Sequence, residues 1–165
     1  MSENNKNLLR RHFGEVLNEG KLGVIDEIYT ESYVLDAPVQ TDGSAVSHGQ
    51  TSGRDGLKRR VTLFRTAFPD IHFETPIYIA EDDFVTVQYV FSGTHVGQFR
   101  ELEATGATIK VMGILIATIV DGKIASAVSV FDSGDMMRQL TSETHLHQTG
   151  GFFHKLIGEI RDVFS

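Results

Sequence analysis

The residue best suited to acid/base chemistry is Asp132, a single acid at the end of an apolar, strand-like segment at residues 123–132. A carboxyl group at the rim of an apolar surface holds its proton more tightly than one in water, because low polarity disfavours the charged form. Such a group can take a proton from a carbon beside a carbonyl and deliver one to a new alkoxide. We therefore expect Asp132 to act as a general acid/base. The structural alternative is that it caps a helix starting near Asp135.

Three further side chains are candidate ligand contacts, and each also has an ordinary structural explanation. Tyr33 and Asp36 lie on and just after a short predicted strand, residues 33–35, and could meet a ligand at the mouth of a cavity. An acid before Pro38 is more commonly a surface residue. Tyr89 could stack on a ligand or form a hydrogen bond to it, but core packing explains this residue equally well.

The histidines do not combine into a predicted metal or catalytic site. His95 belongs to a glycine-bracketed turn, where a structural hydrogen bond is expected, and His72 fits a solvent-facing strand position. His145, His147 and His154 have a spacing that can bind a metal, but no rigid frame holds them, so we interpret that segment as a polar linker. The chain has no cysteine, which excludes a disulfide, a thiolate zinc site and a cysteine nucleophile.

Charge and hydropathy argue against two classes of partner, nucleic acids and the membrane interior. The chain of 165 residues has a formal net charge of −7, and because phosphates are bound by clustered cations, a nucleic-acid ligand is not expected. The one basic cluster, Lys58-Arg59-Arg60, is predicted to be a solvated helix face. No apolar run approaches the ~20 residues of a membrane span, and the N-terminus has no hydrophobic signal region. We therefore expect a cytoplasmic protein without a membrane span.

Helical periodicity marks the first part of the chain, and strand patterns mark the second. Amphipathic helices are predicted at residues 3–19, 22–29 and 54–68, and a polar loop that carries His48 at residues 39–53. Strands are predicted at residues 33–35, 71–79, 84–92, 109–120 and 123–132, with Asp121-Gly122 as a tight hairpin turn between the last two. Helices followed by a meander of strands indicate an α+β fold, with helices packed on one face of an antiparallel sheet.

The strand at residues 84–92 shows how a hollow could form. Its apolar side chains alternate with polar ones, which gives the strand one face for a core or pocket and one outer face. Gly93, Gly97 and Gly113 lie where a sheet could bend strongly around that pocket.

The end of the chain is predicted to be a separate unit. Residues 141–151 are polar, and the apolar residues between Phe152 and Phe164 have helical spacing. We therefore divide the chain into a domain at residues 1–140 and a polar linker with a C-terminal amphipathic helix at 141–165. The charges of this helix nearly cancel, so docking onto the domain or a second subunit is favoured over binding to a membrane surface.

Seven short motifs in one order resemble the SnoaL-like polyketide cyclase (ester cyclase) family of the nuclear transport factor 2-like superfamily. They are Tyr33-Val34, Gly53-Arg54-Asp55-Gly56-Leu57, Ala67-Phe68-Pro69-Asp70, Gly93-Thr94-His95-Val96-Gly97-Gln98-Phe99, Thr105-Gly106, Asp121-Gly122-Lys123-Ile124 and Met137-Arg138-Gln139-Leu140. The resemblance covers residues 7–140. It implies a cone-shaped α+β barrel, a curved antiparallel sheet with the N-terminal helices on its concave face, that is open at one end around an apolar pocket. It also implies a homodimer formed through the outer sheet face, and no cofactor.

The resemblance also implies roles for particular residues. In the family, an acid on the last strand is thought to shuttle a proton during intramolecular aldol ring closure, and Asp132-Ser133-Gly134 lines up with that position. This chain departs from the family at three other places. It has Leu115 where relatives often carry an acid, Ala127-Val128 where many carry His-Trp, and Asp36-Ala37 where a His-Asp pair is common. Leu115 and Val128 are therefore candidate contacts in a more apolar pocket.

The leading hypothesis is a cofactor-free cyclase or isomerase that acts on an apolar, polyketide-like carbonyl compound in an enclosed pocket, with Asp132 as proton shuttle. The second hypothesis is a non-catalytic carrier of a small hydrophobic ligand, which the apolar replacements favour. In the third, the cone is only a dimerisation platform, and the C-terminal helix is the element that binds a partner.

Overall fold

The structure, a computed structural model, describes the backbone of residues 2–40 and 46–142. Side chains are described for the same residues except those between 37 and 50. The predicted C-terminal helix and the three histidines with metal-like spacing therefore lie outside the described residues. Within the described part of the chain, no helix is long and apolar enough to cross a membrane.

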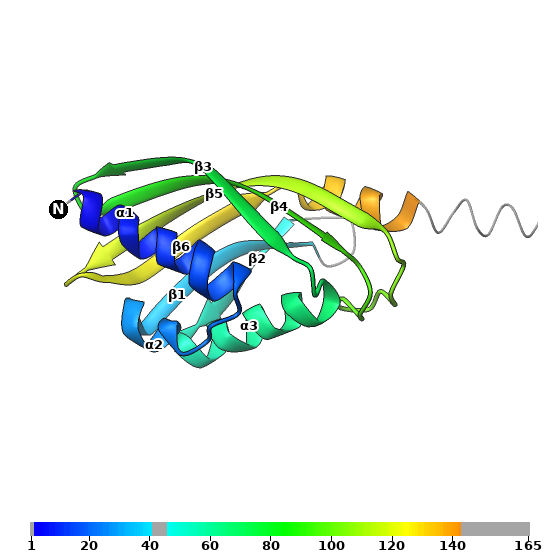
Figure 1. The fold of residues 1–165 in the computed structure, drawn as a ribbon, viewed down its shortest axis with the longest axis horizontal. Helices are drawn as coiled ribbons and strands as arrows, with labels where there is room; N and C mark the ends of the chain where they lie inside the picture. Colours follow the sequence, from blue (N-terminus) through cyan, green and yellow to red (C-terminus); the bar gives the residue numbers. More distant parts are fainter. Residues whose placement is uncertain (1, 41–45, 143–165) are drawn as a thin grey trace, which may run out of the picture.

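A six-stranded sheet curves around the N-terminal helices, as Figure 1 shows. In chain order the elements are α1 (Ser2–Arg11), the π-helix η1 (His12–Asn18), α2 (Val24–Ile28), β1 (Tyr29–Gln40), β2 (Val46–Ser52), α3 (Gly53–Ala67), β3 (His72–Glu81), β4 (Phe84–Thr94), β5 (Thr108–Val120) and β6 (Lys123–Phe131). A last helix occupies residues 133–142. The strand order is β2-β1-β6-β5-β4-β3. The expected α+β class is confirmed.

The sheet differs from a closed antiparallel barrel in two ways. Strands β1 and β6 pair in parallel, while the other neighbours are antiparallel, so the sheet is mixed. Strands β2 and β3 are its two edges, so the sheet does not close on itself. Strand β1, which precedes the meander in the chain, thus lies beside the last strand of that meander.

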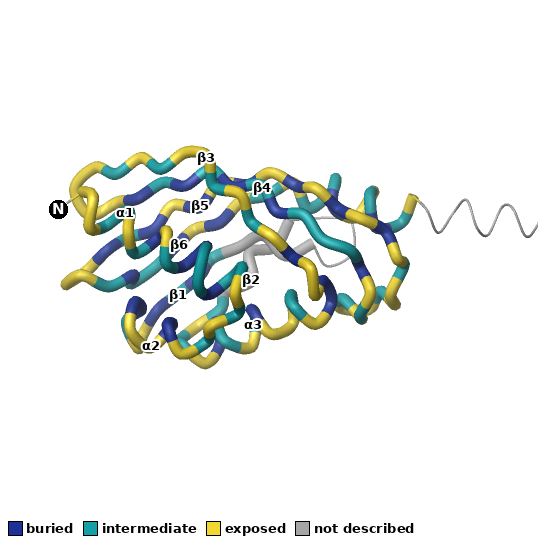
Figure 2. The backbone as a smooth tube through the Cα atoms, viewed as in Figure 1, coloured by how far each residue is buried: buried dark blue, intermediate teal, exposed yellow. Residues whose placement is uncertain are grey.

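Buried and exposed side chains alternate along β5, and this alternation distinguishes the two faces of the sheet. Ile109, Val111 and Leu115 are buried on the concave face, whereas Met112 and Ile114 are exposed on the other face. Figure 2 shows this alternation along the backbone of the long strands. The hairpin from β5 to β6 turns at Asp121-Gly122 with φ angles of 49° and 71°, as a type I′ turn requires.

The segment expected as a loop at residues 39–53 contains strand instead. Strand β1 continues to Gln40, and β2 pairs with it antiparallel, with Asp36 opposite Gln50 and Ala37 opposite Gly49. The prediction was wrong because an edge strand is held by backbone hydrogen bonds. A sequence rich in glycine, serine and threonine gives no hydrophobic alternation from which such pairing could be inferred.

The first predicted helix is divided into a regular and a widened part. From His12 onward the helix is a π-helix, and the N–H of Glu19 donates to the carbonyl of Gly14 at 3.1 Å, a spacing of five residues. The Asn18 side chain then pairs with the backbone of Phe73 through two hydrogen bonds of 3.0 and 2.7 Å. These bonds fix the end of η1 to the edge strand β3 and bury Phe13 against the sheet.

Candidate functional site

A cavity of about 80 Å³ lies between η1, α3 and the concave face of the sheet. A single water needs roughly 10–15 Å³ on a comparable measure, so the space is several times larger. Its wall is mainly apolar and includes Phe13, Leu35, Val61, Ile71, Phe91 and Phe131. Tyr33, Tyr89, Ser129, His12, Arg60 and Arg65 supply the polar groups.

Tyr89 crosses the floor of the cavity from β4 to β6. It faces Gly113 on the neighbouring strand, and a Cβ at Gly113 would collide with the Tyr89 ring. Its hydroxyl lies 2.8 Å from the Ser129 hydroxyl on β6. Burial raises the pKa of Tyr89, so the phenol is neutral at pH 7. Gly113 therefore makes room for an aromatic ring, whereas the sequence predicted only a bend at this position.

His12 and two tyrosines form an aromatic cluster at the N-terminal end of η1. The Tyr29 hydroxyl lies 2.6 Å from Nδ1 of His12, and the rings of Tyr29 and Tyr33 meet edge to face at 4.5 Å. Burial lowers the pKa of His12 to about 3 and raises the pKa of both tyrosines. All three side chains are neutral at pH 7. Because its pKa is far below 7, His12 holds a proton too weakly to be an efficient general base at that pH.

Arg60 brings a positive charge to the cavity wall. It follows Leu57 by three residues and precedes Phe64 by four, which places it on the buried face of α3. Its guanidinium lies 5.4 Å from the centre of the Phe64 ring. Burial lowers the pKa of Arg60, but a guanidinium stays protonated at neutral pH. The sequence interpretation of Lys58-Arg59-Arg60 as a solvated face fits Arg59, which is exposed, and is wrong for Arg60.

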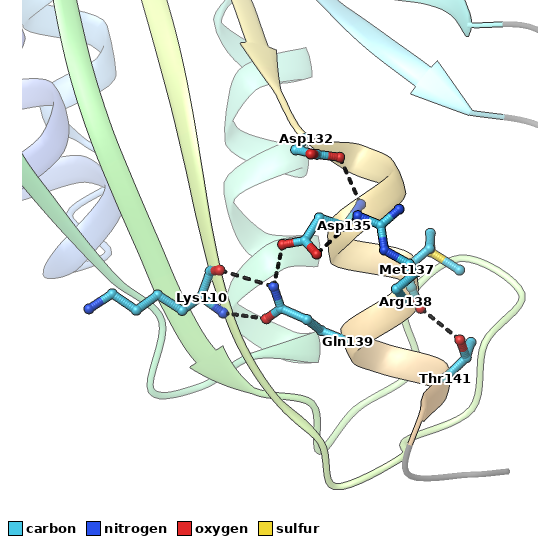
Figure 3. Close-up of polar contacts among 7 residues, drawn as sticks. All are labelled: Lys110, Asp132, Asp135, Met137, Arg138, Gln139 and Thr141. Atoms are coloured by element: carbon cyan, nitrogen blue, oxygen red, sulfur yellow. Dashed lines mark hydrogen bonds and ion pairs between the residues drawn. The ribbon is translucent and has the colours of Figure 1, made fainter.

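Asp132 lies outside the cavity wall. Its carboxylate accepts a hydrogen bond of 2.7 Å from the N–H of Asp135, and its carbonyl accepts one of 3.0 Å from the N–H of Met136. Figure 3 shows the carboxylate at the start of the helix at residues 133–142. Ser129 and Phe131 face the cavity, so alternation along the strand turns Asp132 away from it. This is the helix-capping geometry of the structural alternative.

That last helix is fastened to β5 by a side-chain amide. Gln139 accepts a hydrogen bond of 2.7 Å from the N–H of Lys110 and donates one of 3.1 Å to its carbonyl, as Figure 3 shows. Asp135 accepts a further bond of 2.6 Å from the same amide. The capping position of Asp132 is therefore part of a connected set of contacts.

The other predicted contacts are divided between the two faces of the sheet. Tyr33, Tyr89 and Leu115 belong to the cavity wall, and Asp36 does not. Val128 is 45% exposed on the opposite face, with a register position across from Ile116. A ligand in this cavity therefore cannot touch Val128, which corrects its predicted position. The inward neighbour is Ala127, which is buried.

His95 belongs to the loop that joins β4 to β5, and its side chain is buried. Its ring stacks on Phe68 with centroids 5.2 Å apart, and its Nδ1 accepts a hydrogen bond of 3.2 Å from the N–H of Thr105. This geometry agrees with the structural role expected for it. His72 is exposed on β3, as expected for a solvent-facing position.

The cavity can therefore enclose an apolar molecule and stabilise a negatively charged oxygen. No carboxylate belongs to its wall among the residues that the structure describes. Residues 2–40 and 46–142 also contain no group of three or more histidine, aspartate or glutamate side chains that could hold a metal ion. The sequence reasoning missed Arg60, His12 and Ser129. For Arg60, its spacing from the apolar residues Leu57 and Phe64 could have predicted a position on the buried face of the helix.

Comparisons with known proteins agree on one family and fold. The family model described as SnoaL-like polyketide cyclase matches residues 7–140. A candidate SnoaL-like polyketide cyclase from Jannaschia sp. CCS1 superposes with a TM-score of 0.75 at 18% identity, covering 85% of this chain and 93% of that one. TsrD from Streptomyces laurentii superposes with a TM-score of 0.69 at 25% identity, covering 84% of this chain and 95% of that one.

A third solved structure carries a different assignment. AclR, a candidate hydroxylase from Streptomyces galilaeus, superposes with a TM-score of 0.69 at 19% identity, covering 86% of this chain and 98% of that one. Likenesses at such identities establish the fold and leave the reaction open. Among curated proteins, none matches the chain.

Proposed function

The chain belongs to the SnoaL-like polyketide cyclase family, and from this premise we propose that it cyclises or isomerises a small, mostly apolar, polyketide-like carbonyl compound without a cofactor. The observation that carries the proposal is the cavity itself. An apolar enclosure holds hydroxyl groups from Tyr33, Tyr89 and Ser129 beside the Arg60 guanidinium. Such an arrangement favours a reaction in which a negative charge develops on an oxygen.

Intramolecular aldol closure is the reaction that this arrangement suits best. A base removes a proton from the carbon beside a carbonyl, and the resulting enolate carbon forms a bond to a second carbonyl carbon of the same molecule. The alkoxide so formed takes up a proton, and hence no oxidant or reductant is consumed. In this proposal the hydroxyl groups of the wall donate hydrogen bonds to the enolate and alkoxide oxygens.

Asp132 is the proposed proton shuttle, and the support for this role is its motif position in the family. Its exposed, helix-capping geometry argues against the role, because a base must come within hydrogen-bond reach of the proton that it removes. Catalysis by Asp132 is therefore tested separately from binding in the cavity.

The test is turnover of a panel of small poly-β-ketone acids and their esters, followed by mass spectrometry and ultraviolet absorption. The expected product is an isomer of the substrate, or the isomer after loss of water. Replacing Asp132 by Asn should abolish turnover if this residue carries the proton. Unchanged turnover would remove Asp132 from the mechanism and leave the cyclase proposal standing. Absence of product with every acid and every ester would contradict the cyclase proposal.

The second candidate function is carriage of a small hydrophobic ligand without chemistry. The specific observation in its favour is that the described cavity wall contains no carboxylate, while Asp132 faces away. Native mass spectrometry of the freshly purified protein distinguishes the two functions. A bound compound that persists unconverted during incubation favours carriage, whereas its conversion to an isomer favours catalysis.

We further propose that the protein is a homodimer formed through the outer face of the sheet. Exposed apolar side chains occur on that face of β3, β5 and β6, with Thr86 and Gln88 of β4 between them. They include Ile77, Ile79, Met112, Ile114, Ile116 and Val130. Exposed apolar side chains gathered on one face mark sites of protein association. A second copy of the same face would cover them.

A further inference from the structure

Arg60 is a partly buried cation in the cavity wall, and within the described residues it has neither a hydrogen bond nor an ion pair. Its contacts are the Phe64 ring at 5.4 Å and electrostatic interactions with Tyr33, Tyr89 and Arg100. Arg65, five residues further along α3, differs in this respect. Its guanidinium donates hydrogen bonds of 2.9 Å to the carbonyls of Leu17 and Asn18. Arg65 thus holds η1, whereas Arg60 makes no comparable hydrogen bond to any described residue.

The side chains that share the wall with Arg60 do not neutralise its charge. The wall contains no aspartate or glutamate among the described residues. Tyr33 and Tyr89 are neutral at pH 7, because burial raises the pKa of each. His12 is neutral as well, because burial lowers its pKa to about 3. The empty cavity is therefore positively charged.

A cation in such a place is costly unless something pairs with it. A guanidinium presents a planar fork of N–H donors that matches the two oxygens of a carboxylate. The phenolic groups of Tyr33 and Tyr89 can donate further hydrogen bonds to the same anion. The remaining wall is aromatic and aliphatic, which suits a hydrocarbon body.

We propose that the occupant of this cavity is a largely apolar carboxylic acid, bound as its anion with the carboxylate on Arg60. This inference rests on the proposed function in one respect, since it names the substrate class of the same cavity. The net charge of −7 is a weak objection, because exposed charges further away than about 8 Å are largely screened at physiological salt.

The experiment compares benzoate with benzamide, two probes of nearly equal shape that differ in charge. Both are titrated into the whole protein and followed by amide chemical shifts of cavity residues such as Ser129 and Leu115. We expect wild type to bind benzoate at least about tenfold more tightly than benzamide, as a charge-assisted hydrogen bond implies. The Arg60→Gln variant should lose this preference, and Arg60→Lys should keep part of it.

Arg59→Gln is the matched control, since it removes the same charge from an exposed position on the same helix. It should retain the preference for benzoate. The proposal is overturned if wild type does not bind benzoate in the cavity, if benzamide binds as tightly, or if Arg60→Gln keeps the preference. These outcomes concern binding only. Turnover of the poly-β-ketone esters can therefore fail while the preference for the anion holds, and the reverse is equally possible.

Discussion

The Tyr89 ring lies over Gly113 on the next strand, in the space that the side chain of any other residue at position 113 would occupy. This contact lets the Tyr89 hydroxyl reach Ser129 on β6. The floor of the cavity therefore depends on a glycine for its shape, because the ring could not lie flat across β5 otherwise.

Replacing Gly113 with alanine should destabilise the protein by about 1–3 kcal/mol, since overpacking in a fixed core moves side chains and backbone. Urea unfolding gives the free energy of unfolding. Gly14→Ala is the control, because nothing lies within 4 Å of a Cβ added there. That variant should be neutral or slightly stabilising. A Gly113→Ala protein as stable as wild type would show that Tyr89 moves aside at no cost.

Asp132 should prove to be a helix cap in stability measurements, whatever its role in turnover. Asp132→Ala should lower the free energy of unfolding by about 1 kcal/mol, because the N–H of Asp135 loses its acceptor. Asp132→Asn should lose much less, since asparagine caps helices as well as aspartate does. Thermal or urea unfolding of the two variants measures the difference. Equal stability of Asp132→Ala and wild type would contradict the capping role.

The α+β class and the concave face of β4 could be predicted from sequence, because alternation along that strand separates apolar from polar residues. Strand β6 could not be oriented in the same way. Its outward residues Val128 and Val130 are as apolar as its inward ones, so the period of two does not mark the buried face. Val128 was expected to meet a ligand because of its place in the family motif. The strand pattern offered nothing against that expectation, and the inward-facing Ser129 was overlooked.

Arg60 was misjudged for a different reason. Three consecutive basic residues resemble a solvated face, but consecutive residues on a helix point about 100° apart, so they cannot all lie on one face. The position of a charge relative to the apolar stripe carries the information, whereas membership of a charged run does not. The parallel pairing of β1 with β6 is a long-range contact, and no local pattern marks it.

Removing the charge of Arg60 should stabilise the empty protein. Arg60→Met keeps much of the side chain's volume and removes an unpaired, partly buried cation, so we expect a gain of about 1 kcal/mol. For a domain of this size that corresponds to a rise of about 2–4 °C in Tm. Differential scanning calorimetry without ligand measures it, and Arg59→Met should change little. A lower Tm for Arg60→Met would mean that Arg60 has a stabilising partner.

Acid should weaken the protein partly through His12. Its pKa falls from an ordinary value of 6.5 to about 3 in the folded state, so below pH 6.5 the unfolded chain binds a proton that the folded chain does not. The contribution of this residue to stability is therefore present above pH 6.5 and is lost progressively as the pH falls toward 3. The slope is at most about 1.4 kcal/mol per pH unit.

The measurement is the free energy of unfolding of wild type and His12→Gln at pH 7.5 and pH 5. Burial also lowers the pKa of His95, so both proteins should lose stability on acidification, and the informative quantity is the difference between them. We expect wild type to lose more than His12→Gln. An equal loss would mean that His12 does not titrate on unfolding.

The proposed dimer predicts that a single charge on the outer sheet face separates the subunits. Ile114 is 46% exposed at the middle of β5, and in a face-to-face dimer Ile114→Glu would bury a carboxylate from each subunit. Light scattering during size-exclusion chromatography should give wild type twice the chain mass of 18.3 kDa and the variant that mass once. Leu63→Glu, which alters a 65% exposed residue on α3, should remain dimeric. A monomeric wild type at micromolar concentration would contradict the dimer, because a stable interface of this kind holds together at such concentrations.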